Sequence, residues 1–284
     1  MILIADSGST KTDWVIILDH PSKDARKQLT VVSTQGLNPI YLKDSEITDT
    51  ILKSSLVDYI YEINEVYFYG SGVTVQQESR MKALLHSVFP HADKIETASD
   101  MLGAARAVCQ HTSGIACILG TGANCGYYDG QRIMPGTPPA LGYILGDEGS
   151  GAVLGKLFLN GIFKGTLPSA LRDAYEEETH QTLVDVINRV YRQPLANRYL
   201  ASASLFISHH LDCLPLRDLV VNNFRTFFRI NLHQYQHADY PIGVIGSIGY
   251  HYAAELREAA QLEGFTIGVI AKSPLEGLVT YHQK

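Results

Sequence analysis

The feature that most constrains the fold is a short unit that occurs twice, an apolar strand that runs into a turn of glycine, serine and threonine. The first copy spans residues 2–10 and leads into a strand-like run at 13–18. The second spans residues 116–122 and leads into a run at 124–128. Two apolar runs joined by a short glycine-containing turn are typical of a β-hairpin. Any α/β protein contains several such turns, but their position near the starts of two halves favours a duplicated fold.

Around these units, strand-like and helix-like segments alternate, which predicts an α/β protein. Beyond the hairpins we expect strands at 29–34, 65–69, 94–97, 131–134, 242–246 and 266–271. We expect helices at 47–61, 79–89, 100–109, 149–160, 249–264 and 274–282, and several more between 167 and about 235, with breaks at Pro194 and Pro215. The pattern predicts two domains, 1–107 and 108–284, the second with a helical insert. The last helix could pack back on the first domain.

Composition narrows the class of protein. The chain has 284 residues, of which 45% are hydrophobic, so one or two domains with a sizeable core are expected. Its net charge of −6 argues against nucleic acid as a partner. Its apolar runs are far shorter than the ~20 residues of a membrane span. Four cysteines without a CxxC pair and an N-terminus without a basic region predict a cytoplasmic protein with reduced thiols.

The first turn carries residues suited to a polyanion. Gly8 lets backbone amides approach a phosphate, Ser9 and Thr10 add hydroxyl donors, and Lys11 adds a positive charge. Asp6, at the end of the preceding strand, could hold Mg²⁺, which favours one or two carboxylates plus phosphate oxygens. The segment lacks the pattern of a Walker A loop. The alternative is an ordinary hydrophilic hairpin turn.

Two further glycine turns fit a nucleotide. Gly120, Thr121 and Gly122 end the strand of the second unit, and paired with the first turn they could clamp the β- and γ-phosphates of a nucleotide. Gly246 and Ser247 lie between a strand and a helix and could offer a flat surface to an adenine or ribose. A simple connection between a strand and a helix explains this last turn equally well.

A glycine-rich block around Asp147 and Glu148 is the third candidate. Four glycines within residues 142–151 indicate a close approach of backbone to ligand, whereas acidic residues at the start of a helix explain Glu148 well. Asp100 follows a short strand, where it is either a helix cap or a carboxylate at a ligand-binding edge. Asn38 is either a turn residue or a contact to a polar substrate.

These blocks, in this order, resemble the superfamily of sugar kinases, heat-shock chaperone ATPases and actin. More closely, they resemble its N-acetylglucosamine kinase branch, which also contains ATPase activators of benzoyl-CoA reductase and 2-hydroxyacyl-CoA dehydratase. The resemblance implies two ribonuclease-H-like domains with ATP and substrate in the cleft between them. It implies that Thr10 and Thr121 contact ATP phosphates and that Gly246 and Ser247 lie near the nucleoside.

The resemblance also implies a catalytic base at Asp100. The positions that match amino-sugar contacts in the family are Asn38, Ala123, Asn124, Gly142 and Asp147. Two of them stand in altered surroundings, because the animal-type enzyme has serine where this chain has Ala123 and Gly-Trp-Gly where it has Leu141-Gly142-Tyr143. The identity of the sugar is therefore left open.

The implied activity is ATP- and Mg²⁺-dependent phosphorylation of an N-acetylated amino sugar by a cytoplasmic enzyme, and the resemblance leaves a homodimer open. One alternative is an ATPase activator of a CoA-ester reductase or dehydratase. Such activators share an iron–sulfur cluster across a dimer and need cysteine ligands from each subunit. Here Cys109, Cys117 and Cys125 fall in or beside predicted buried elements and Cys213 stands alone, so there is no plausible pair of ligands. The other alternative is a nucleotide-dependent sugar sensor without catalysis.

Overall fold

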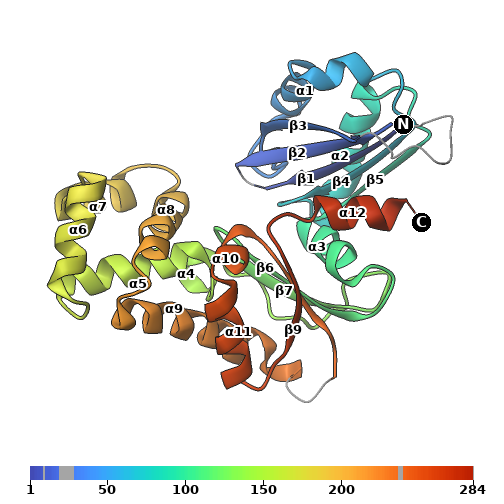
Figure 1. Cartoon of the computed structure of the whole chain (residues 1–284). Coiled ribbons are helices and arrows are strands. Elements are labelled where there is room, and N and C mark those ends of the chain that lie inside the picture. The colour runs from blue at the N-terminus through green and yellow to red at the C-terminus, as the bar shows by residue number, and fades with distance from the viewer. Residues whose placement is uncertain (9, 19–28, 236–238, 284) are drawn as a thin grey trace. The chain divides into compact units, whose positions relative to one another are not determined.

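A computed structural model of the chain describes residues 1–8, 10–18, 29–235 and 239–283 (Figure 1). The chain forms two compact units. The first contains Met1–Thr112, Gly130–Ile133 and Pro274–Lys284, and the second contains Ser113–Asp129 and Met134–Ser273. The boundary expected after residue 107 falls inside a helix, α3 (Asp100–Cys109).

The sheet of the first unit has five strands in the order β3-β2-β1-β4-β5. The strands are β1 (Ile2–Ser7), β2 (Lys11–Ile17), β3 (Leu29–Gln35), β4 (Glu65–Gly70) and β5 (Lys94–Ser99). β2 is antiparallel to both of its neighbours, whereas β1, β4 and β5 run parallel. Ser7, Gly70 and Ser99 are in register at the ends of the three parallel strands. Carboxyl ends of parallel strands are where α/β proteins bind ligands.

Side chains alternate between the two faces of this sheet, so each face carries its own apolar contacts. One face, with Leu3 and Phe68, belongs to the core formed with α1 (Asp44–Leu52) and α2 (Val75–Val88). On the opposite face Tyr69 lies against α3, where a Cβ on Gly103 would come within 2.7 Å of the Tyr69 Cβ. The C-terminal helix α12 (Leu275–His282) packs on α3 and β1 (Figure 1). That packing is close, since a Cβ on Gly277 would lie 2.4 Å from the Ala107 carbonyl oxygen.

The second unit repeats this arrangement with four strands in the order β7-β6-β8-β9. They are β6 (Gly114–Leu119), β7 (Ala123–Tyr128), β8 (Ile242–Ile245) and β9 (Ile267–Ala271). β6 forms an antiparallel hairpin with β7 and runs parallel to β8, which in turn runs parallel to β9. β1, β2, β4 and β5 have the same connectivity, so the predicted duplication and the α/β class are confirmed.

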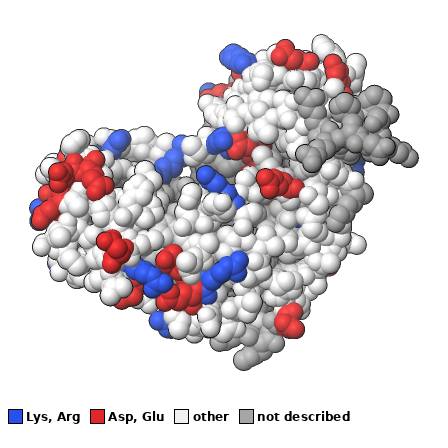
Figure 2. Space-filling view, in the orientation of Figure 1, with Lys and Arg blue, Asp and Glu red and all other residues white. Residues whose placement is uncertain are grey.

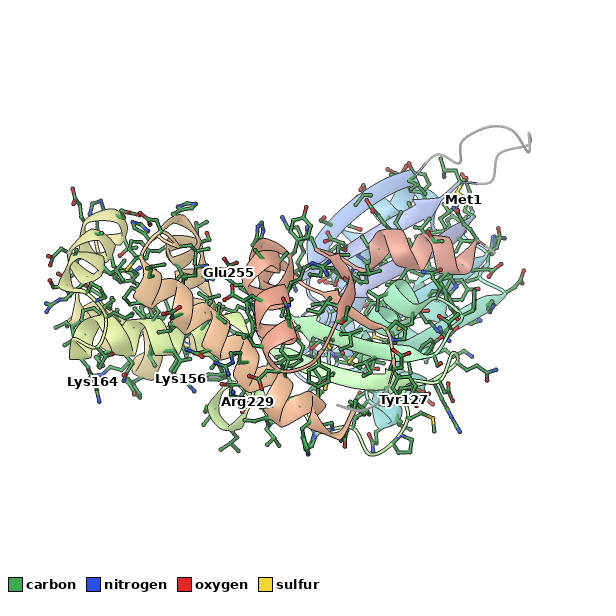
Figure 3. All side chains as sticks on the ribbon, turned by 60° about the horizontal axis from the view of Figure 1, so that its bottom comes forward. Met1, Tyr127, Lys156, Lys164, Arg229 and Glu255 are labelled. Atoms are coloured by element: carbon green, nitrogen blue, oxygen red, sulfur yellow. The ribbon has the colours of Figure 1, made fainter. Side chains whose placement is uncertain are left out.

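Helices make up most of the second unit. They are α4 (Gly142–Leu145), α5 (Gly151–Lys164), α6 (Ser169–Thr179), α7 (Leu183–Arg192), α8 (Ala196–His209), α9 (Leu214–Phe227), α10 (Ser247–His251) and α11 (Ala253–Leu262). α5 packs so closely on α8 that a Cβ on Gly155 would lie 1.9 Å from the Leu200 carbonyl oxygen. Lys156 and Lys164 point away from that contact into solvent (Figure 3). A single π-helical turn (Phe228–Leu232) extends α9.

Charged side chains of both signs are interspersed on the face drawn in Figure 2. Several form pairs within the second unit. Glu263 accepts from Arg225 Nε at 2.6 Å and from Arg229 Nε at 2.7 Å. Glu255, labelled in Figure 3, is buried, with its Oε1 3.6 Å from the Arg217 Nε. Among the helices described, none is both long and apolar enough to cross a membrane.

Several of the predicted elements differ from the structure. The helix expected over 47–61 ends at Leu52, and a 3₁₀ turn (Ser55–Tyr59) follows, because the Ser54 hydroxyl accepts the Leu56 N–H and starts a new turn. The strand expected at 131–134 is reduced to a single bridge residue, Ile133. It follows a turn in which Gly130 has φ +102°.

Candidate functional site

The β1–β2 turn is held by main-chain hydrogen bonds. The Gly8 N–H donates to the Lys11 carbonyl at 2.9 Å, and the Gly36 N–H donates to the Thr10 carbonyl at 3.0 Å. Gly8, Thr10 and Lys11 are exposed there, as expected of residues that meet a ligand, and Lys11 Nζ lies 2.8 Å from Asp13 Oδ1. Ser9, the fourth residue predicted to contact a nucleotide in this turn, lies outside the described residues.

Two buried hydroxyl groups hold the β1–β2 turn in place. Ser7 Oγ and Thr12 Oγ1 lie 2.7 Å apart, and Ser7 Oγ also accepts the Leu37 N–H at 3.1 Å. Both side chains are fully buried, so these bonds are shielded from water. They tie the hairpin to the segment after β3 and keep the exposed part of the turn in place.

Asp6 and Asp100 lie close enough in the first unit to affect each other's charge. Burial, and after it the nearby carboxylates of Asp100 and Asp13, raise the pKa of Asp6 to about 7 against the opposing effect of Lys11. Burial also raises the pKa of Asp100. A desolvated pair of carboxyl groups at the ends of parallel strands is a typical functional arrangement. The geometry therefore brings the predicted metal ligand and the predicted base together.

Asp100 is not the cap of its helix. The cap of α3 is Ser99, whose Oγ accepts the Leu102 N–H at 3.2 Å. Asp100 Oδ1 accepts the Met101 N–H at 2.9 Å, and this main-chain bond orients the carboxylate at the first turn. The capping role that the sequence allowed for Asp100 is wrong, and its carboxylate remains available for another task.

Asn38 has a clear structural role. Its side chain is buried, and its Oδ1 accepts the Ile40 N–H at 2.9 Å, which forms a turn around Pro39. It lies against Gly72, where φ is +81° and a Cβ would come within 2.2 Å of that Oδ1. Gly72 follows β4, so Asn38 is at the same edge of the sheet as Asp6. The turn interpretation is supported, and the sugar contact stays a prediction.

The β6–β7 turn is built into the start of α5. The Gly120 N–H donates to the Gly122 carbonyl at 3.0 Å, and the carbonyls of Gly120 and Thr121 accept the N–H groups of Gly151 and Ala152 at 2.9 and 3.1 Å. No atom lies within 4 Å of the place where a Cβ on Gly120 would be. Packing therefore does not require glycine at position 120.

At position 246, in contrast, packing does require glycine. It has φ +125°, and a Cβ there would lie 2.3 Å from the Leu119 carbonyl oxygen. Its N–H donates to the Ala271 carbonyl at 3.0 Å, which holds the end of β8 against its neighbours. Ser247, the first residue of α10, is exposed. The close packing accounts for Gly246 without a ligand, and the contact of these two residues with a nucleoside stays a prediction.

The block around Asp147 is a compact turn before α5. Asp147 has φ +57°, an uncommon conformation that aspartate tolerates better than most residues. The Ala123 N–H donates to its carboxylate, while burial and the neighbouring Glu148 raise its pKa. The interpretation of Glu148 as a helix-start residue is wrong. α5 begins at Gly151 with Ser150 as its cap, so Glu148 lies outside the helix.

This block lines a cavity of about 150 Å³ in the second unit. Ligand sites for drug-sized molecules usually measure ~300–1,000 Å³, so this one suits a smaller group. Its side chains with hydrogen-bonding capacity are Asn124, Asp147, Glu148 and Asn231. Its apolar wall is formed by Pro138, Pro139, Ala140, Leu141, Leu145 and Ile230.

The cavity brings together three of the residues predicted to contact substrate, Ala123, Asn124 and Asp147. It does not include Gly142, which lies beside it at the exposed start of α4 with φ +73°. The sequence analysis missed Asn231, which reaches the cavity only because the π-helical turn places it there. No local pattern marks that position.

A second hollow, of about 240 Å³, is lined by His180, Gln181, Asp185, Asn188, Arg189 and Gln193. It lies around α7 in the helical insert and contains none of the predicted site residues. Although it is larger, it lacks the glycine turn and the half-buried carboxyl groups that accompany the cavity beside Asp147.

Comparison with known proteins identifies the family. No protein-family model and no curated protein matches the chain. The solved structure of a candidate N-acetylglucosamine kinase from Porphyromonas gingivalis is 44% identical, with a TM-score of 0.92 over 99% of this chain and 98% of that one.

More distant structures share the fold alone. A candidate N-acetylglucosamine kinase from Chromobacterium violaceum has 16% identity and a TM-score of 0.67 over 99% of this chain and 98% of that one. A ROK-family glucokinase from Streptomyces griseus, solved with glucose and AMPPNP, has 12% identity and a TM-score of 0.56 over the same shares. The duplicated sheets are thus those of the actin-like fold of sugar kinases. With 44% identity over nearly its whole length to the first of these proteins, the chain belongs to the N-acetylglucosamine kinase family.

Proposed function

We propose that this protein is a sugar kinase that transfers the γ-phosphoryl group of ATP to a hydroxyl of an N-acetylated amino sugar. The observation that carries the proposal is the cavity of about 150 Å³ beside Asp147, which is lined by both hydrogen-bonding side chains and apolar residues. Such a cavity suits one sugar-sized group rather than a whole nucleotide.

Asp100 is the proposed general base. Burial raises its pKa, which brings the carboxylate closer to the range in which a base works well near neutral pH. The bond from the Met101 N–H to Oδ1 fixes its direction. In the proposed reaction Asp100 orients the sugar hydroxyl and takes its proton as the oxygen attacks the γ-phosphorus, and ADP leaves.

Asp6 is the proposed ligand of Mg²⁺. Among the side chains described, no group of three or more His, Cys, Asp or Glu residues is arranged to hold a metal ion. Mg²⁺ usually needs only one or two carboxylates, with water and phosphate oxygens as further ligands. The desolvated Asp6, next to Asp100 and with a pKa of about 7, fits a site in which a cation offsets the negative charge. When bound, Mg²⁺ would neutralise the β- and γ-phosphate oxygens.

The two hairpin turns are the proposed phosphate contacts. Gly8, Thr10 and Lys11 are exposed on the first turn and Thr121 on the second. The open space above Gly120 supports this role, because nothing in the packing explains the missing side chain. Phosphoryl transfer passes through a loose transition state, so positioning and charge neutralisation supply most of the catalysis. Gly246 and Ser247 are the proposed nucleoside contacts.

The test is a panel of sugars assayed for ADP release with ATP and Mg²⁺. It includes N-acetylglucosamine, N-acetylmannosamine, N-acetylmuramic acid, glucosamine and glucose, with a sugar-free reaction as the control. The proposal expects at least one N-acetylated sugar to raise ADP release well above the sugar-free rate. Release at the sugar-free rate with every sugar would contradict it and would favour the non-catalytic sensor. A homodimer and a cytoplasmic location remain predictions from the sequence.

A further inference from the structure

We infer that Ile230 and Asn231, together with Glu148, form the part of the cavity that recognises the acetamido group of the sugar. This inference rests on the proposed function, because it assigns residues to the specificity of the same site.

The π-helical turn presents both residues to the cavity. Ile230 and Asn231 are neighbours in the turn Phe228–Leu232, and both line the cavity. Phe228 and Leu232, at the two ends of the turn, are completely buried and anchor it in the core. Ile230 is 49% exposed, so its apolar side chain is free to contact a ligand. Turns of this kind are rare and occur frequently at functional sites.

Asn231 and Glu148 offer a donor and an acceptor side by side. Asn231 Nδ2 lies 3.4 Å from Glu148 Oε2 and 3.3 Å from the Phe227 carbonyl oxygen. Both distances exceed the usual 2.9–3.0 Å, so the amide is oriented but weakly bonded. A stronger acceptor from a ligand could therefore replace one of these contacts.

The chemistry of an acetamido group matches this arrangement. Its carbonyl oxygen would accept from Asn231 Nδ2, its N–H would donate to the Glu148 carboxylate, and its methyl group would pack on Ile230 and the adjacent proline wall. A sugar with a hydroxyl at the same carbon can bond with only one of Asn231 and Glu148. It also leaves Ile230 without a methyl group to contact. Sites that hydrogen-bond one substrate group discriminate strongly against analogues that lack it.

The other two polar side chains of the cavity accept main-chain N–H groups. Asn124 Oδ1 accepts the Cys125 N–H at 2.9 Å, and the Asp147 carboxylate accepts the Ala123 N–H. These bonds fix their directions, which suits contacts with ring hydroxyls. The pair of Asn231 and Glu148 is thus the part of the cavity best suited to an added amide.

The test compares two sugars and two matched substitutions. Asn231→Ala removes the amide from the cavity, and Asn222→Ala removes an exposed asparagine from α9 as the control. Calorimetric titration with N-acetylglucosamine and with glucose measures both dissociation constants, and thermal unfolding checks the fold. We expect Asn231→Ala to weaken N-acetylglucosamine binding about 10- to 100-fold and to leave glucose binding nearly unchanged. Asn222→Ala should leave both constants at the wild-type values.

Ile230→Ala is the second variant, because truncating a half-exposed side chain should not unfold the protein. It should lower the preference for N-acetylglucosamine over glucose by about 10-fold. The inference is overturned if both cavity variants keep the wild-type preference, if they weaken both sugars equally, or if the wild type binds neither sugar. Sugar binding that depends on Asn231 in a protein that releases no ADP would contradict only the proposed function. ADP release with an unchanged sugar preference in both variants would contradict only this inference.

Discussion

At the scale of single residues, the glycines of the predicted nucleotide turns fall into two groups. Gly246 is required by the fold, since its φ is +125° and a Cβ would overlap the Leu119 carbonyl. Gly120 is not, because no atom lies within 4 Å of a Cβ placed there. A glycine without a packing reason is the better indication of a ligand that approaches the backbone.

This difference predicts opposite results for two alanine substitutions. Gly120→Ala should fold like the wild type and raise the KM for ATP about 10-fold or more, because the methyl group occupies the space for a phosphate. Gly246→Ala should lower the free energy of unfolding by at least about 2 kcal/mol. Thermal unfolding and ATP kinetics of the two variants check this. Wild-type ATP kinetics in a well-folded Gly120→Ala protein would remove the second hairpin from the nucleotide site.

The single-residue results also show why sequence resolved some roles and not others. Asp100 could be either a cap or a functional carboxylate, and only the Leu102 N–H bond to Ser99 excludes the cap. In the sequence Glu148 resembles a helix-start residue because the predicted helix begins at residue 149, two residues before α5 begins. Asn231 had no distinguishing neighbours in the sequence, since its position depends on a change in helical pitch.

At the scale of elements, the sequence predicted strands better than helix ends. The strand expected at 65–69 is β4 (Glu65–Gly70), whereas the helix expected at 149–160 is α5 (Gly151–Lys164), which ends four residues later. The helix expected over 249–264 is divided into α10 and α11, which meet at Tyr252. Tyr252 is buried, and its Oη donates to the Ser204 carbonyl at 2.5 Å. Tertiary contacts of this kind leave no periodic pattern, so the division could not be predicted.

The C-terminal helix α12 carries a histidine, His282, whose surroundings disfavour its protonated form. The His282 ring stacks on Tyr67 at 3.7 Å between centroids, and its Nε2 lies 2.8 Å from Tyr69 Oη. Arg106 Nη1 donates to the same Oη at 2.6 Å, so the tyrosine can donate to a neutral imidazole. Burial, followed by the positive charges of Arg106 and Lys94, lowers the pKa of His282 to about 3.

The stability of the protein should therefore fall in mild acid. An unfolded histidine has a pKa near 6.5, so between pH ~6.5 and ~3 the unfolded state binds a proton that the folded state does not. At pH 5 this costs up to about 2 kcal/mol of unfolding free energy relative to neutral pH. Denaturant unfolding at both pH values should show a smaller loss for His282→Gln than for the wild type. The exposed His251→Gln serves as the control, and an equal loss in all three proteins would refute the assignment.

At the scale of the whole molecule, the repeated hairpin was the most informative feature of the sequence. It predicted two related sheets, and β2-β1-β4-β5 and β7-β6-β8-β9 have the same connectivity. The extension of the first unit to Thr112 and its inclusion of Pro274–Lys284 depend on packing such as that of Gly277 on Ala107. Such long-range contacts are set by tertiary structure and could be anticipated only as a possibility.

The most direct test of the account is the rate at which the wild type and Asp100→Asn convert N-acetylglucosamine and ATP to a sugar phosphate, detected by mass spectrometry. Asparagine keeps the size of the side chain, and Ser99 still caps α3, so the fold and ATP affinity should be unchanged. The account predicts a phosphorylated sugar from the wild type and a kcat about 10²–10⁴-fold lower for Asp100→Asn. Asp173→Asn, an exposed change on α6, should keep the wild-type rate. A near-wild-type rate in Asp100→Asn, or no sugar phosphate from the wild type, would contradict the account.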